Sequence, residues 1–90
     1  MTTHKVKSWV GLFEPIYNGQ KTHDLRDMVD RNYKVGDILL LQEYDQFAGK
    51  YTGREAKVKI TYITSNVTPC ALSSNALAKD HCILSISLVE

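Results

Sequence analysis

Three charged side chains follow a glycine within eight residues in the first third of the chain. Lys21, Asp24 and Arg26 come after Gly19. If the segment is extended, alternation puts Asp24 and Arg26 on one face and Lys21 on the other. A carboxylate two residues before an arginine can fix its guanidinium and leave the remaining donors for a ligand. The segment 19–26 is therefore a candidate binding site; the alternative is a solvated strand with an ion pair of little consequence.

A second candidate is the sequence Tyr51-Thr52-Gly53-Arg54, which puts an aromatic ring and a guanidinium around a glycine turn at the mouth of a strand. Aromatic rings beside cations can stack on bases while the cations contact phosphates. For three residues a structural interpretation is preferred: Lys57 and Lys59 lie on a solvated strand face, and Trp9 lies in the core. The basic residues interleaved with aromatic ones are Lys5, Lys7, Lys21, Arg26, Arg31, Lys34, Lys50, Arg54, Lys57 and Lys59.

Other chemistries find little support in the sequence. There is no phosphate-binding glycine loop, no nucleophile elbow and no paired-cysteine metal motif. His23, His81, Cys70 and Cys82 lack ligand-pair spacing, so we expect no metal and no cofactor. A Cys–His nucleophile pair stays open without distances. The two cysteines fit reduced, buried thiols, and Cys82 at the start of a strand is typical of packing.

The composition indicates a single domain over residues 1–90. A hydrophobic share of 43% and a charged share of 23% are ordinary for a globular chain. The formal charge of +1 neither demands nor forbids a nucleic-acid partner. No apolar run has the length of a membrane span, and the N-terminus lacks a signal-peptide pattern. We expect a cytoplasmic protein without a membrane partner, and the sequence does not indicate a protein partner.

Hydrophobic periodicity predicts several strands and one or two short helices. The expected strands are 4–7, an extended stretch after Gly19, 38–44, 54–64 as its hairpin partner, and 81–89. A short helix is expected within 9–18, where Pro15 either kinks it or lies in its first turn. Residues 27–34 and 65–80 read as loops, with one helical turn possible in the second. The fold class is α+β, a small, mostly antiparallel β-barrel.

The spacing Gly19-x-Lys21-x-x-Asp24-x-Arg26 resembles the Gly-x-Lys-x-x-Glu-x-Arg signature of ASCH domains, which belong to the PUA-like superfamily. Asp24 stands where the signature usually has Glu, which keeps the charge and shortens the side chain by one methylene. Two further blocks, Lys34-Val35-Gly36-Asp37 and Tyr51-Thr52-Gly53-Arg54-Glu55, resemble a short ASCH-like subfamily of bacteria and their phages.

The resemblance implies a small PUA-like barrel with a cleft beside the signature, and binding of RNA or a modified nucleotide. Lys21, Asp24 and Arg26 would line that cleft, and the loop argument adds Tyr51 and Arg54. In this hypothesis Lys21 and Arg26 contact phosphate or a base edge, Asp24 orients Arg26, and Tyr51 stacks. It requires Lys21, Arg26 and Arg54 to converge on one concave, positively charged pocket.

The alternative function is a small hydrolase or ribonuclease acting on nucleosides or RNA, with Lys21 as general base. One branch of ASCH relatives is an amidohydrolase that uses a Lys, a Thr and a Glu. This chain keeps the Lys as Lys21 but has Asp24 where that branch has its Thr. Asp24 suits an orienting carboxylate better than a nucleophile.

Overall fold

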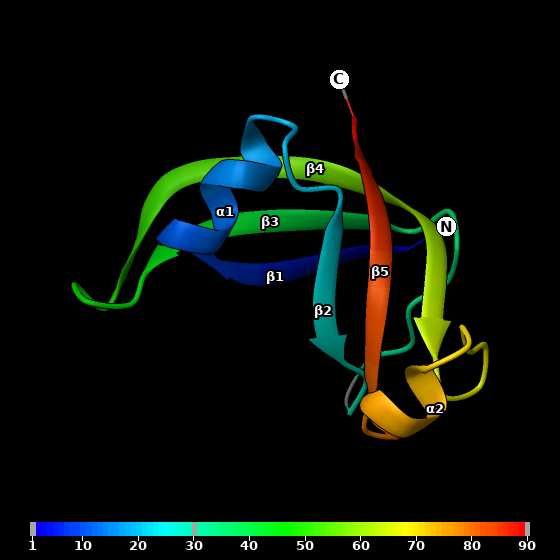
Figure 1. The fold of residues 1–90 in the computed structure, drawn as a ribbon. Helices are drawn as coiled ribbons and strands as arrows, with labels where there is room; N and C mark the ends of the chain where they lie inside the picture. Colours follow the sequence, from blue (N-terminus) through cyan, green and yellow to red (C-terminus); the bar gives the residue numbers. More distant parts are fainter. Residues whose placement is uncertain (1, 30, 90) are drawn as a thin grey trace.

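Five strands form one curled sheet in the computed structural model, which describes residues 2–29 and 31–89 (Figure 1). Two short helices accompany the sheet. In chain order the elements are β1 (Thr3–Trp9), α1 (Val10–Tyr17), β2 (His23–Asp27), β3 (Ile38–Asp45), β4 (Lys50–Ser65), α2 (Ser73–Ala76) and β5 (His81–Leu88).

The strand order is β1-β3-β4-β5-β2, with β1 parallel to β3 and the other neighbours antiparallel. The long strand β4 belongs to both halves of the sheet, because it pairs with β3 first and with β5 further along. Its register with β5 shifts between Ile60 and Tyr62, and such irregularities bend a strand. The sheet therefore curls into a half-barrel (Figure 1), which confirms the α+β class and the mostly antiparallel pairing.

Strict alternation puts one face of each strand inside the curl. On β1 the inward side chains are His4, Val6 and Ser8, and on β3 they are Leu39, Leu41 and Glu43. The apolar core consists of Val6, Phe13, Ile16, Tyr33, Leu39, Leu41, Ala56, Val58, Ile60, Cys82, Leu84 and Ile86. Polar side chains thus share the inner face with this core.

Helix α1 covers one end of the curl with Phe13 and Ile16, both fully buried. Pro15 lies inside this helix, not in its first turn. The chain leaves the helix through Gly19, whose φ of +84° favours glycine. Beyond it, the amide of Lys21 donates to the carbonyl of Pro15 at 2.9 Å, which sets the start of the segment leading into β2.

Two burial predictions were wrong. Trp9 is 52% exposed, because it is the last residue of β1 and points to the outer face, where it precedes the helix. Cys70 is an exposed free thiol in the segment before α2, whereas Cys82 is buried and free, as the packing interpretation predicted. Lys57 and Lys59 lie on the exposed face of β4, as predicted.

The sheet does not close into a complete barrel by strand pairing, since β1 and β2 are its two edges in the described part of the chain. Arginine side chains bridge part of this opening. Arg26 of β2 donates through Nη2 to the carbonyl of Lys7 at 2.8 Å, and Arg31 donates to the carbonyl of Lys5 at 2.9 Å. These bonds satisfy acceptors on the outer edge of β1. Neither described helix has the length and apolar character that crossing a bilayer requires.

Candidate functional site

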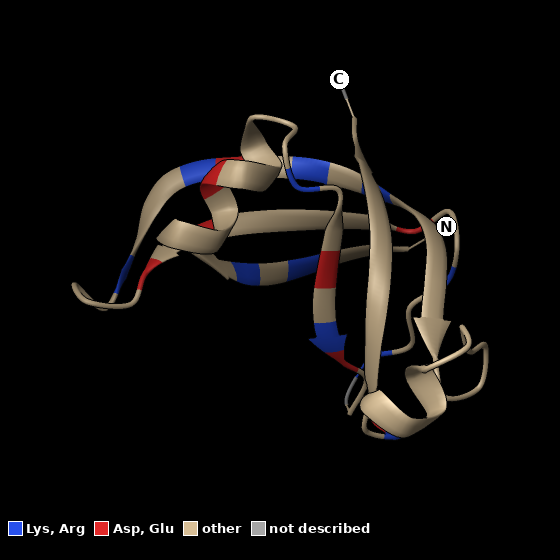
Figure 2. Cartoon of the chain, in the orientation of Figure 1, with Lys and Arg blue, Asp and Glu red and all other residues tan. Residues whose placement is uncertain are grey.

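A concave, positively charged surface lies at the β1 edge of the sheet. It encloses about 370 Å³ and has four cationic side chains and one carboxylate in its lining. Figure 2 shows basic segments on β1 and at the end of β2, the two strands that flank it. We call this surface the basic groove; it is lined by Lys5, Val6, Lys7, Arg26, Asp27, Arg31, Tyr33, Gln42 and Tyr51.

The outer face of the sheet supplies one wall of the basic groove. Lys5 and Lys7 alternate outward on β1, and Lys7 is in register with Gln42 of β3. The Lys7 ammonium lies 4.3 Å from the centroid of the Tyr44 ring, a cation–π contact. Tyr44 in turn meets Tyr51 edge to face, with ring centroids 5.1 Å apart. Lys5, Lys7 and Tyr51 therefore line the basic groove, and Tyr44 connects Lys7 to Tyr51.

The predicted Asp24–Arg26 pair is present, and its arginine contributes to the lining of the basic groove from β2. Arg26 Nε donates to Asp24 Oδ2 at 2.8 Å, while Nη2 donates to the Lys7 carbonyl. A guanidinium carries five N–H donors, so these two bonds leave three for a ligand. The pair lies on one face of β2, as alternation predicted, and Asp24 is buried.

Residue Arg31 extends the charged surface from the loop after β2. Its Nη2 bond to the Lys5 carbonyl fixes it two residues along β1 from the Arg26 contact. Tyr33 is buried beside these arginines, and burial raises the pKa of its phenol, an effect that the charges of Arg26 and Arg31 oppose. The sequence prediction did not include Lys5, Lys7, Arg31 or Tyr33 in the site. The alternating lysines of β1 were the available signal.

The structure places Arg54 in a different environment. Its Nε and Nη2 atoms donate to both oxygens of the buried Glu43 at 2.9 Å, and Nη2 also meets Glu14 Oε1 at 2.9 Å. The guanidinium lies against the rings of Phe13 and Tyr17, at 5.2 and 4.9 Å from their centroids. We call this group of five residues the arginine cluster. Two carboxylates thus neutralise Arg54 there.

The arginine and the two carboxylates of the arginine cluster stabilise one another's ionised forms. Hydrogen bonds from Arg54, and then from Thr52, lower the pKa of Glu43, although burial opposes them. Hydrogen bonds to Glu43 and Glu14 raise the pKa of Arg54. The cluster joins β3, β4 and α1, and its two carboxylates leave it no net positive charge to attract a phosphate.

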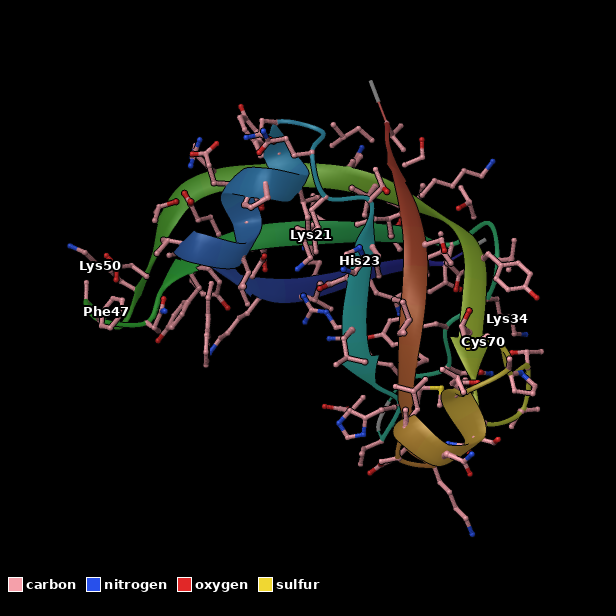
Figure 3. All side chains as sticks on the ribbon, viewed as in Figure 1. Lys21, His23, Lys34, Phe47, Lys50 and Cys70 are labelled. Carbon is pink, nitrogen blue, oxygen red and sulfur yellow. The ribbon has the colours of Figure 1, made fainter. Side chains whose placement is uncertain are left out.

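Lys21 lies in a third place, between the end of α1 and the start of β2 (Figure 3). It lines a small hollow of about 170 Å³ whose other residues are Ile16, Gly19, Thr22, Val58, Ile86, Ser87 and Leu88. Lys21, Arg26 and Arg54 therefore do not converge on one pocket, so the single site that the signature hypothesis requires is not formed by these three residues. Of the five predicted residues, Arg26 and Tyr51 share the basic groove, with Asp24 bonded to Arg26 behind its lining.

Histidine, cysteine and carboxylate side chains do not gather into a metal site in the described part of the chain. Within residues 2–29 and 31–89, no group of three or more of them is placed to hold a metal ion. Two histidine–carboxylate contacts are isolated pairs: His4 with the buried Asp37, and His81 with Asp80. The His4 hydrogen bond, followed by amides of Thr2 and Lys34, lowers the pKa of Asp37. This pair ties β1 to the turn before β3.

Comparison with known proteins identifies a family and a phage relative. The family model described as "Domain of unknown function (DUF3850)" matches residues 3–86. The "Uncharacterized 12.9 kDa protein in GpA 3'region" of Escherichia phage P2 is 39% identical over 61 residues. That alignment covers 68% of this chain and 53% of the phage protein, so the chain spans about half the length of this curated relative.

Proposed function

The chain belongs to the DUF3850 family, and we propose that it is an RNA- or nucleotide-binding module that holds phosphate groups in the basic groove. One observation carries the proposal: Lys5, Lys7, Arg26 and Arg31 surround one concave surface that Asp27 alone lines with negative charge. Cations gathered in this way supply the backbone-contacting part of nucleic-acid recognition.

Hydrogen bonds to β1 hold Arg26 and Arg31 in position for phosphate binding. Backbone carbonyls already orient Arg26 and Arg31, so less side-chain freedom is lost when a phosphate binds. Tyr51, half exposed at the same surface, offers a ring on which a base can stack. A volume of about 370 Å³ is within the range of small-ligand sites and suits one nucleotide unit at a time.

We further propose that the chain is an ASCH-type domain of the PUA-like superfamily. The curled sheet and the Asp24–Arg26 pair support this assignment. Lys21 and Arg54 fall outside the basic groove, so the proposed binding site differs from the one that the signature implies. Nucleic-acid binding by these two residues stays a prediction.

The test is binding of a fluorescently labelled single-stranded RNA over a salt series. The double variant Lys5→Gln/Lys7→Gln is compared with Lys57→Gln/Lys59→Gln, a matched pair on the exposed face of β4 outside the basic groove. We expect the first to weaken binding about tenfold at low salt and to lower the salt slope by about 1 for each phosphate that the variant no longer binds. Equal weakening by both variants, or no binding by the wild type at low salt, contradicts the proposal.

The hydrolase alternative has its own test. Its candidate site is the small hollow that Lys21 lines together with Thr22 and Ser87, separate from the basic groove. Incubation with acylated nucleosides and with single-stranded RNA would reveal turnover. Product formation that disappears in Lys21→Ala would establish catalysis, and intact substrates would leave binding as the function.

A further inference from the structure

A second hollow adjoins the basic groove. It encloses about 490 Å³, and Lys7, Arg26 and Asp27 line both spaces. The two hollows are therefore neighbours on the surface. We call the second one the side hollow; it is lined by Lys7, Ser8, Trp9, Leu12, Asp24, Leu25, Arg26 and Asp27.

Large apolar side chains form the rim of the side hollow. Trp9 is 52% exposed, Leu12 51% and Leu25 56%. Trp9 and Leu12 come from the junction of β1 and α1, whereas Leu25 comes from β2. An indole ring and two leucines around one opening suit a flat, apolar surface such as the face of a base.

Polar side chains of nearly buried residues line the same hollow. Ser8 is 5% exposed and Asp24 is 9% exposed. Asp24 Oδ2 accepts the bond from Arg26, while Oδ1 and the Ser8 hydroxyl have no hydrogen-bond partner among residues 2–29 and 31–89. Neither atom is among the fully buried polar atoms that lack a partner, so both are open to solvent and can be reached by a ligand. The side hollow thus offers one obligatory acceptor and one group that can donate or accept.

We propose that the side hollow receives one unpaired nucleobase, and that the ligand of the basic groove is therefore single-stranded RNA. This inference rests on the proposed function, because the phosphates beside the inserted base occupy the basic groove. The base lies against Trp9 and directs an N–H of its edge to Asp24 Oδ1. Ser8 bonds a neighbouring edge atom. In a duplex those edge atoms are already paired, so a double strand cannot supply them.

Charge and polarity argue against other occupants. The side hollow has two carboxylates, Asp24 and Asp27, against two cations, so it attracts a phosphate less than the basic groove does. A purely aliphatic side chain would cover Trp9 and the leucines but would remove water from Ser8 and Asp24 without replacing its hydrogen bonds. A nucleobase combines an apolar face with a polar edge and satisfies both parts of the site.

Trp9 gives a direct signal for the test because it is the only tryptophan in the sequence. Three probes are titrated against the full chain: a short single-stranded RNA, the same RNA annealed to its complement, and an abasic phosphodiester chain of equal charge. We expect the single strand to quench Trp9 fluorescence and to bind about tenfold more tightly than either of the others. The abasic chain should still bind through the basic groove without quenching.

Two variants localise the effect. Leu25→Ala changes the exposed rim without touching the core, and Ser8→Ala removes the unpartnered hydroxyl. Each should reduce the preference for the single strand several-fold and leave binding of the abasic chain unchanged. Leu72→Ala, which alters another exposed leucine outside the side hollow, is the matched control and should change neither.

The outcomes separate this inference from the proposed function. If all three probes bind with equal affinity, without Trp9 quenching, and weaken together in Lys5→Gln/Lys7→Gln, the basic groove binds phosphate and the base site is wrong. If none of the probes binds at low salt, the proposed function itself fails. Tighter binding of the duplex than of the single strand would also overturn the inference.

Discussion

Arg26 and Arg54 are the same residue type in two different environments. Arg54 meets two carboxylates and two aromatic rings, so its charge is compensated within the arginine cluster. Arg26 meets one carboxylate and one backbone carbonyl and lines a surface with three further cations. A carbonyl positions a guanidinium without cancelling its charge. The number of carboxylates around each arginine therefore separates the stabilising contact of Arg54 from the contact that we propose for Arg26 with a ligand.

We expect the largest change in stability from a substitution that breaks the arginine cluster. Glu43→Ala removes a carboxylate that is 4% exposed and accepts bonds from Arg54 and Thr52. We expect the free energy of unfolding to fall by about 2 kcal/mol, since charge-assisted hydrogen bonds are removed from a buried place. Urea denaturation measures this change. RNA affinity of the folded protein should stay within about twofold of the wild type, because the basic groove does not include the cluster; a large loss of affinity would mean that the two regions are coupled.

The second expected effect is on the pH dependence of stability. The folded-state pKa of Glu43 lies below its ordinary 4.5, because Arg54 and Thr52 bond to its ionised form. The unfolded chain then binds this proton at higher pH than the folded chain does, so the stabilisation is fully present well above pH 4.5 and declines as acid is added. Asp37 behaves in the same way through its bond with His4.

The free energy of unfolding of Glu43→Gln should therefore decrease less between about pH 5 and pH 3 than that of the wild type. The contribution of Asp37 to this decrease should remain. Thermal unfolding at several pH values measures the slope. An acid profile identical to that of the wild type would show that the Glu43–Arg54 pair contributes nothing to the pH dependence. Glu55→Gln, at an exposed position of β4 where the carboxylate accepts a bond from the Gln42 amide, is a suitable control.

The smallest expected effect separates charge from geometry at Arg26. Arg26→Lys keeps the charge but loses the planar fork that joins Asp24 to the Lys7 carbonyl. We expect RNA affinity to fall about threefold and stability to change by less than about 0.5 kcal/mol. Fluorescence titration and urea denaturation measure both quantities. If the free energy of unfolding falls by more than the free energy of RNA binding, Arg26 is a structural residue like Arg54.

Alternation along the chain was sufficient to predict the strands and the Asp24–Arg26 pair. Both depend on neighbours within one strand, where a period of two determines which side chains share a face. The burial of Trp9 was predicted wrongly, because its spacing fits the helical face of Phe13 and Ile16 although it is the last residue of a strand. A junction between two periods allows either assignment.

The partners of the predicted site residues could not be read from the sequence. Glu43 and Glu14 lie 11 and 40 residues from Arg54, and only the folded sheet with α1 brings them together. The basic groove has the same origin: Lys7 and Arg26 are 19 residues apart and meet across the opening of the half-barrel. Periodicity predicts which side chains share one face of a strand, whereas the strand order determines which strands lie next to each other.

The arginine bonds to β1 also bear on self-association. An outer strand with free carbonyls can pair with a strand from another molecule, the first step toward edge-to-edge aggregation. Arg26 and Arg31 occupy two of those carbonyls with bulky, charged side chains. The residues that we propose to contact phosphate thus also keep this edge from joining a neighbouring copy, so a variant without both arginines combines weaker ligand binding with colloidal instability.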